Sequence, residues 1–151
     1  MEDFLTGCEG WLTGIEILDA QHVELAACIG EVADACHSAK KKPGLLDMVN
    51  NLYRRTKKHF EYEEAVMREV GYPEFSAHQR EHIMLLAELK LAINRGGGAD
   101  EIIMNSEMVR ELKVWFMAHI KHSDCRFSAY ISHRKLASKI NLISPKKTLD
   151  L

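Results

Sequence analysis

The sequence predicts an all-α protein, an antiparallel up-down-up-down four-helix bundle with an N-terminal arm and a basic C-terminal tail. Three observations support this fold class. Apolar residues recur every three or four positions along most of the chain, no segment shows the alternation of a strand, and short turns with glycine or proline separate four long stretches. With 151 residues, 46% hydrophobic and 28% charged, the chain can form one domain with a buried core.

Each helix is predicted from a stripe of inward-facing residues and from the residues that stop it. The first helix is expected to start near Asp19 and to end before a run of lysines and a proline. The second and third are expected along the stripes 45–70 and 75–92, ended by Gly71 with Pro73 and by Gly96-Gly97-Gly98, and the fourth is expected to start near Asp100. The stripes are His22, Leu25, Ile29, Val32, Cys36; Leu45, Val49, Leu52, Thr56, His59, Glu63, Val66, Val70; Phe75, His78, His82, Leu85, Leu89, Ala92; and Met108, Leu112, Trp115, His119.

Seven side chains that can bind a metal lie on these stripes or beside them, and the predicted topology brings all seven to one end of the bundle. A single histidine in such a stripe is more often a hydrogen-bonded core residue than a ligand. Five of the eight histidines at one level are a different matter, because metal ions satisfy them together. Five imidazoles and two carboxylates exceed the needs of one zinc ion and suit two iron-like ions. The seven are His22, His59, Glu63, His78, His82, His119 and Asp124.

One spacing does not fit a regular helix. Asp124 follows His119 by five residues, which places it about 140° away from the stripe on an α-helix. Either the helix bends or takes a π-type turn there, or Asp124 approaches the site from the side. His122 competes with Asp124 as a ligand, because it continues the stripe three residues after His119.

In combination, the motifs of this chain resemble those of a bacterial hemerythrin over about residues 8 to 131. The resemblance implies a non-heme di-iron centre that binds dioxygen reversibly, as an oxygen carrier, store or delivery protein and not as an enzyme. The motifs are Trp11 with Asp19-Ala-Gln-His22, His59-Phe-Glu-Tyr-Glu63-Glu-Ala-Val-Met67, Gly71-Tyr72-Pro73, His78-x-x-x-His82, and Trp115-x-x-x-His119-Ile120-x-x-x-Asp124.

The resemblance also implies which residue does what. One iron would be held by His78, His82 and His119, and the other by His22 and His59 alone. Glu63 and Asp124 would bridge the two irons together with an oxo or hydroxo group. The family has the same histidine-to-aspartate spacing, which favours Asp124 over His122. The iron with two histidines keeps an open position, where dioxygen would bind.

Phe116 and Ile120 flank His119 and are candidates to line the oxygen pocket. Phe116 departs from the pattern of the family, whose members usually carry leucine just after the tryptophan. The larger ring would narrow the pocket and change ligand affinity and autoxidation.

Two other functions compete with the carrier. A ferritin-like di-iron oxidase would need Glu-x-x-His on two helices, and no glutamate lies three residues before a histidine in this chain. A sensing module for oxygen, nitric oxide or iron stays open, although the chain shows no second domain to receive the signal.

Composition argues against several classes of partner but does not decide the role of the C-terminal tail. A net charge of −2 gives no reason to expect nucleic acid, no apolar run can span a membrane, and the N-terminus lacks the features of a signal peptide, so the cytoplasm is expected. The bundle is expected over residues 1–133. The basic segment 134–151 is expected to be a solvated, partly disordered tail, with docking to an acidic protein as the sharper alternative.

Overall fold

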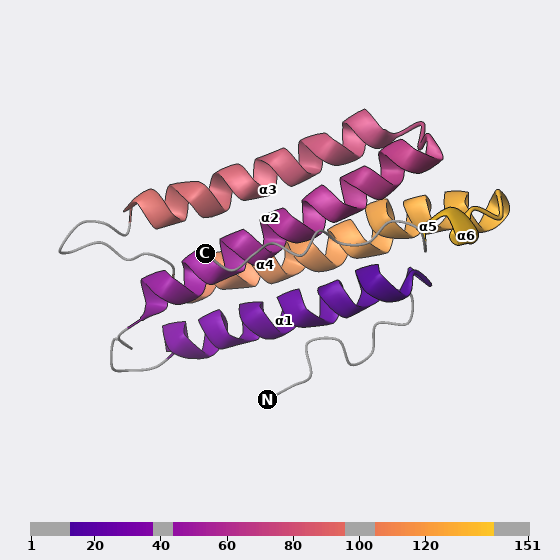
Figure 1. Ribbon diagram of the computed structural model, residues 1–151. Coiled ribbons are helices and arrows are strands. Elements are labelled where there is room, and N and C mark those ends of the chain that lie inside the picture. Colours follow the sequence, from indigo (N-terminus) through magenta and orange to yellow (C-terminus); the bar gives the residue numbers. More distant parts are fainter. Residues whose placement is uncertain (1–12, 38–43, 96–104, 141–151) are drawn as a thin grey trace, which may run out of the picture.

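The computed structural model describes residues 13–37, 44–95 and 105–140, and within these ranges every regular element is a helix and none is a strand. Successive long helices alternate in direction and form an antiparallel four-helix bundle, which confirms the predicted fold class (Figure 1). α1 packs against α2 and α4, and α2 packs against α3. The elements are α1 (Glu16–His37), α2 (Leu45–Val70), α3 (Phe75–Arg95), α4 (Ser106–His119), η1 (Ile120–Asp124), α5 (Cys125–His133) and α6 (Ala137–Ile140).

The start of α1 differs from the prediction, because the helix begins three residues before Asp19. The Asp19 carboxylate accepts hydrogen bonds from the backbone N–H groups of Thr13 (2.7 Å) and Gly14 (3.1 Å) and from the Thr13 hydroxyl (2.7 Å). Thr13 Oγ1 also accepts a bond from the backbone N–H of Ile15 at 3.1 Å. Asp19 therefore holds the segment that leads into α1 against the first turns of the helix. These hydrogen bonds fix the turn that precedes His22.

Gly71 ends α2 at the turn to α3, as the sequence predicts. Its φ of 67° is left-handed, a conformation that glycine adopts without steric cost. The backbone N–H groups of Gly71 and Tyr72 bond to the carbonyls of Arg68 (3.2 Å) and Met67 (2.9 Å), which closes the last turn of α2. This tight reversal places the end of α2, with Glu63, beside the start of α3, with His78 and His82.

The fourth helix is described from Ser106. Asn105 caps it, because its side chain accepts a hydrogen bond from the backbone N–H of Met108 at 2.9 Å. The predicted start near Asp100 lies outside the described residues. From Ser106 the chain runs through α4, η1 and α5 with helical backbone at both junctions, so the three elements form one rod (Figure 1).

Two apolar clusters fill the interior, and a polar layer separates them along the bundle. The first core contains Val49 and Leu52 of α2, and the second core contains Val66 and Met67 of the same helix. Between them α2 carries polar side chains that are equally buried. The first core also includes Leu25, Ile29, Val32, Leu85, Leu89, Val109, Leu112, Phe116 and Ile120, and the second also includes Leu18, Tyr62, Val70, Tyr72, Phe127, Ile131 and Ile140.

The segment that follows α5 is described as far as Ile140, at the end of α6. The Ile140 side chain is buried in the second core, and α6 contacts α2. The rest of the predicted basic tail lies outside the described residues. None of the described helices is both long enough and apolar enough to cross a lipid bilayer.

Candidate metal centre

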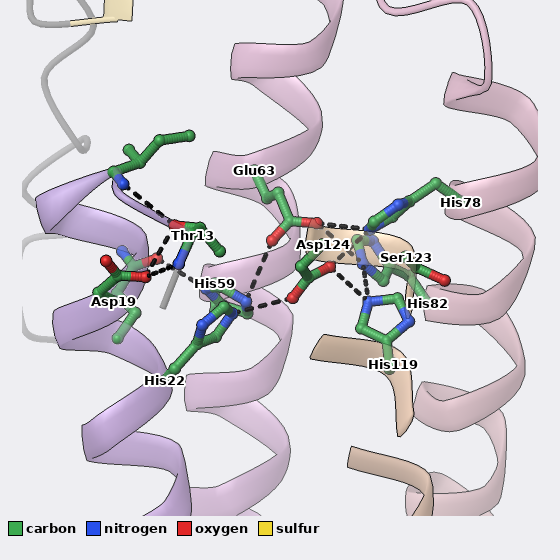
Figure 2. A network of polar contacts seen from close by, with 12 residues as sticks. Thr13, Asp19, His22, His59, Glu63, His78, His82, His119, Ser123 and Asp124 are labelled. Carbon is green, nitrogen blue, oxygen red and sulfur yellow. Dashed lines mark hydrogen bonds and ion pairs between the residues drawn. The ribbon is translucent and has the colours of Figure 1, made fainter. Parts of the chain in front are cut away.

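The polar layer contains all seven residues that the sequence singled out, and they come from α1, α2, α3, α4 and η1. Their side chains converge on one point in the interior (Figure 2). None is more than 4% exposed, although burial of unpaired polar groups is costly. The seven residues are His22, His59, Glu63, His78, His82, His119 and Asp124.

The donor atoms of the layer fall into two groups that share the carboxylates. The first group is Glu63, Asp124 and three histidines from α3 and α4, and the second is Glu63, Asp124 and two histidines from α1 and α2. Within each group the candidate ligand atoms all lie within 4.8 Å of one another. The three-histidine group contains His78, His82 and His119, and the two-histidine group contains His22 and His59.

Each carboxylate turns one oxygen to each group. Asp124 Oδ1 lies 3.1 Å from His78 Nε2 and 3.0 Å from His119 Nε2, and Asp124 Oδ2 lies 3.0 Å from His22 Nε2. Glu63 Oε1 lies 2.5 Å from His78 Nε2, and Glu63 Oε2 lies 3.4 Å from His59 Nε2. Figure 2 shows the two carboxylates standing between the two sets of imidazoles. The arrangement provides two adjacent positions for cations with shared carboxylates between them.

A π-helical turn brings Asp124 into this layer. The five residues of η1 separate α4 from α5, and the wider turn rotates Asp124 inward, where it is fully buried. Of the explanations that the sequence left open, the structure shows the π-type turn. His122, the competing candidate, is exposed on the outside of the same turn. A regular stripe would direct His122 inward, and because the helix is not regular here, Asp124 faces the layer instead.

Nearby carboxylates raise the pKa of the buried histidines, and burial lowers it. Burial lowers the pKa of His59 to about 3, more than the carboxylate of Glu63 raises it. Burial also opposes protonation of His78 and His119, but their contacts with Asp124 and with other carboxylates outweigh it, and the pKa values rise to about 9 and about 10. The site thus attracts positive charge most strongly on its three-histidine side.

The carboxylates of the layer are held in the charged form. Burial and the neighbouring Asp124 raise the pKa of Glu63, yet contacts with His78 and His82 outweigh both and lower it to about 2. The pKa of Asp124 lies well below its usual range, because His119, His22 and His78 outweigh the effect of burial. Two buried anions in contact need cations beside them.

Residues next to the ligands, which sequence reasoning did not identify, hold the outer nitrogens of three imidazoles. His59 Nδ1 lies 2.7 Å from Gln21 Oε1, His82 Nδ1 lies 2.9 Å from Glu64 Oε1, and His119 Nδ1 lies 2.6 Å from Glu81 Oε2. In each pair the Nδ1–H donates, which leaves the Nε2 lone pair directed at the site. A signal was present in the sequence, because each of the three partners is the chain neighbour of a predicted ligand. They are Gln21, Glu64 and Glu81.

Aromatic rings complete the wall of the site. Phe60 stacks on His82, with ring centroids 3.6 Å apart, and Trp115 stacks on His119 at 4.8 Å. The buried Phe116 ring meets His22 edge to face at 6.2 Å. These rings hold the imidazoles in fixed orientations and keep water away from the layer.

The bonding of these groups fits metal ions. Both oxygens of Glu63 and of Asp124, and the Nε2 atoms of His22 and His78, are buried and make no regular hydrogen bond among the described residues, so their close contacts with one another are ionic. His82 Nε2 and His119 Nε2 lie 3.1 Å apart. Since both rings donate from Nδ1, two lone pairs would face each other unless a proton or a metal ion lies between them. Imidazole nitrogens with carboxylate oxygens suit iron and other first-row metals.

Comparison with known proteins bears directly on this site. The family model of the hemerythrin HHE cation binding domain matches residues 13–129, which include every residue of the two groups. The chain belongs to this hemerythrin family. The suspected resemblance is therefore confirmed, and the match covers the whole bundle from the first turn of α1 into α5.

Bacterial relatives and solved structures agree with the hemerythrin family. A bacteriohemerythrin of Pseudomonas aeruginosa strain LESB58 is 25% identical over 121 residues, covering 80% of this chain and 77% of the relative. A bacteriohemerythrin of Stenotrophomonas maltophilia is 27% identical, over 74% of this chain and 71% of the relative. A crystal structure of wild-type hemerythrin has the same fold, with a TM-score of 0.67 and 24% identity over 78% of this chain and 88% of that one.

Proposed function

We propose that the buried layer binds two iron ions and that the protein binds dioxygen reversibly at this pair. The observation that carries the proposal is the way Glu63 and Asp124 divide their oxygens between two groups of histidines. A single metal ion would leave one of these groups unsatisfied. Two ions sharing both carboxylates satisfy them all, and family membership supports iron as the metal.

The residues would hold the two ions unequally. His78, His82 and His119 would hold one ion and His22 and His59 the other, with Glu63 and Asp124 bridging. The two-histidine group offers one protein ligand fewer, four residues against five, and so leaves room for a small ligand. When bound, the iron pair supplies the two electrons that dioxygen takes up on binding and returns on release.

The protein's own contribution is charge balance and exclusion of water. The two carboxylates offset part of the charge of two ferrous ions, and neutral imidazoles add none, which limits the charge left in a dry interior. Phe116 and Ile120, 4% and 0% exposed, extend the first core up to the layer, and Phe116 lies beside His22 of the more open group. We assign both to the lining of the oxygen pocket. A dry apolar lining disfavours escape of partly reduced oxygen.

Carriage and sensing both require oxygen binding, and an oxidase requires turnover. The donor set favours binding, because only two of its seven residues are carboxylates, whereas ferritin-like oxidases use a glutamate from each of four helices. We therefore propose a binding protein and not an enzyme, with a role as carrier, store or delivery protein ahead of a role as sensor.

An optical experiment tests the proposal. The protein is loaded with ferrous ion without oxygen, exposed to oxygen, and then returned to argon, over several cycles. We expect a visible charge-transfer band that appears with oxygen and disappears under argon. A zinc-loaded sample, whose metal has no redox chemistry, is the control and should show no band. A band that never reverses would contradict the carrier and favour an oxidase or sensor.

A further inference from the structure

The outer hydrogen bonds of the layer follow one rule along the chain. Gln21 of α1 supports a histidine of α2, Glu64 of α2 supports one of α3, and Glu81 of α3 supports one of α4. Each partner is a sequence neighbour of a residue in the layer, so it projects beside the layer and reaches the next helix. Three imidazoles therefore have a hydrogen-bond acceptor at their outer nitrogen, but the three acceptors do not carry the same charge.

The three-histidine group has two charged acceptors. Glu64, whose side chain is 12% exposed, accepts from His82 Nδ1 and also from the side-chain amide of Gln79 at 2.9 Å. Glu81 accepts from His119 Nδ1 at 2.6 Å and from the Ser123 hydroxyl at 2.7 Å. Both carboxylates are thus held by a second donor, which keeps them in position against their imidazoles.

The two-histidine group has no charged acceptor among the residues that the structure describes. His59 donates to the neutral amide of Gln21, and His22 Nδ1 is buried with no hydrogen-bond partner among the described residues. Among the described residues, the acceptors on the two sides therefore differ by two carboxylates, Glu64, which also lies 3.5 Å from Arg68, and Glu81. This difference adds to the difference in the number of histidines.

We propose that Glu64 and Glu81 are positioning residues that make the two metal positions unequal, so that the three-histidine position fills first and empties last. The inference rests on the proposed di-iron site. A carboxylate that accepts from the outer N–H of an imidazole makes the inner nitrogen a stronger donor and fixes the ring, and loss of such a partner typically costs 10–100-fold in metal affinity. A neutral amide fixes the ring but adds no charge.

The rate at which ferrous ion leaves each metal position measures the difference in affinity between the two positions, and it requires no oxygen chemistry. The metal-free protein is loaded anaerobically with two ferrous ions per chain, an excess of a ferrous chelator is added, and the coloured complex is followed with time. The parent protein should release iron in a fast and a slow phase of equal amplitude. In Glu64→Gln and Glu81→Gln, the slow phase should quicken about 10–100-fold while the fast phase moves much less.

The opposite substitution, which adds a carboxylate, distinguishes an effect of charge from a general loosening of the structure. Gln21→Glu puts a carboxylate beside His59 and should slow the fast phase, an effect that no general loosening of the fold produces. Glu61→Gln is the matched control, because Glu61 lies on α2 near Glu64, is exposed and lies 4.0 Å from Lys57. It removes the same charge and should leave both phases unchanged.

The outcomes distinguish this inference from the proposed function. A parent protein that binds no ferrous ion overturns the di-iron site itself. A parent that binds two ions, with variants that release both at parental rates, overturns the role of Glu64 and Glu81 and leaves the proposed function standing. Equal acceleration of both phases also overturns it, since the carboxylates would then act on the bundle as a whole. Selective change, in opposite directions for the two kinds of substitution, supports it.

Discussion

The two halves of α2 bury different kinds of side chain. The first half contributes to a conventional apolar core, and the second half contributes to the candidate metal layer. Val49 and Leu52, in the first half, are 0% and 1% exposed, and His59 and Glu63, in the second, are 2% and 0% exposed. Both halves obey the same spacing of three and four residues, so periodicity alone does not distinguish them. What differs is the condition under which burial is favourable.

Burial in the first core is favourable by itself, because apolar surface leaves water at a gain of about 25 cal/mol per Å². Burial in the polar layer is favourable only if its charges are matched. The oxygens of Glu63 and Asp124 are buried without a regular hydrogen bond among the described residues, so their charges must be matched by protonated histidines or by metal ions. Stability should therefore depend on the first core in all conditions, and on the layer only through its metal and its protons.

The largest expected effect is at the layer. Asp124→Ala removes the oxygens that face both groups, so we expect loss of at least one of the two metal ions. His122→Ala is the matched control, because His122 is exposed on the same π-turn, and it should retain both ions. Metal analysis of the two purified variants decides between them. The reverse pattern would show that the regular stripe selects the ligand.

A substitution in the first core should separate stability from metal. Leu52→Ala leaves a cavity in a site that is 1% exposed, and we expect it to lower the free energy of unfolding by about 2–5 kcal/mol. Metal content should stay at the parental value. Val23→Ala, at a 47% exposed position of α1, should change stability little. Loss of metal in Leu52→Ala would mean that the two regions are not independent.

The number of protons released on metal binding should report which histidines of the layer are protonated. The raised pKa values of His78 and His119, about 9 and about 10, keep both protonated in the metal-free protein at pH 7.5. Because a metal must displace these protons, anaerobic addition of ferrous ion at pH 7.5 should release about two protons per chain. A pH-indicator dye in weak buffer measures this. Metal uptake without proton release would contradict the assignment of these two ligands.

The same pKa values set the pH dependence of the metal-free protein, with the opposite sign to that of metal binding. His78 and His119 bind protons more tightly when folded than their unfolded value of about 6.5. Their contribution to stability is therefore full below about pH 6.5 and is lost as the pH rises through 9. Urea unfolding between pH 6.5 and 9.5 should show falling stability, and a rise would be contrary to the account.

Phe116→Leu should have the smallest effect among the substitutions of buried residues. The substitution shortens a ring that is 4% exposed and lies 6.2 Å from His22, which typically costs about 1–2 kcal/mol in packing. Extra space beside the two-histidine group should speed oxygen release and autoxidation. Stopped-flow rates measure both. Rates equal to those of the parent would place Phe116 in the core only and remove it from the pocket lining.

Much of this fold followed from the sequence because the bundle is governed by local rules. The spacing of stripes and the stop at Gly71 gave α2 and α3 their bounds, and the alternation of helix direction placed His22 and His82 at one level. The prediction failed at the start of α1, because Asp19 can act as a cap from inside the helix through its bonds to Thr13. Such a reach is not visible in the periodicity.

The site was predictable as far as the helices are regular. The π-turn before Asp124 was one of several explanations for an awkward spacing, and only the backbone of η1 distinguishes them. The outer partners Gln21, Glu64 and Glu81 were missed for a different reason. They act between helices, and their pairing depends on which helix lies beside which, something that neighbouring positions in one helix do not specify.

The iron content of the purified protein tests the central claim most directly. Two groups of donors that share Glu63 and Asp124 should hold two ions, so metal analysis of protein expressed with ample iron should give two irons per chain. The same analysis on Asp124→Ala should give one or none. A single tightly bound zinc ion in the parent protein, or a metal content unaffected by Asp124→Ala, would contradict the account.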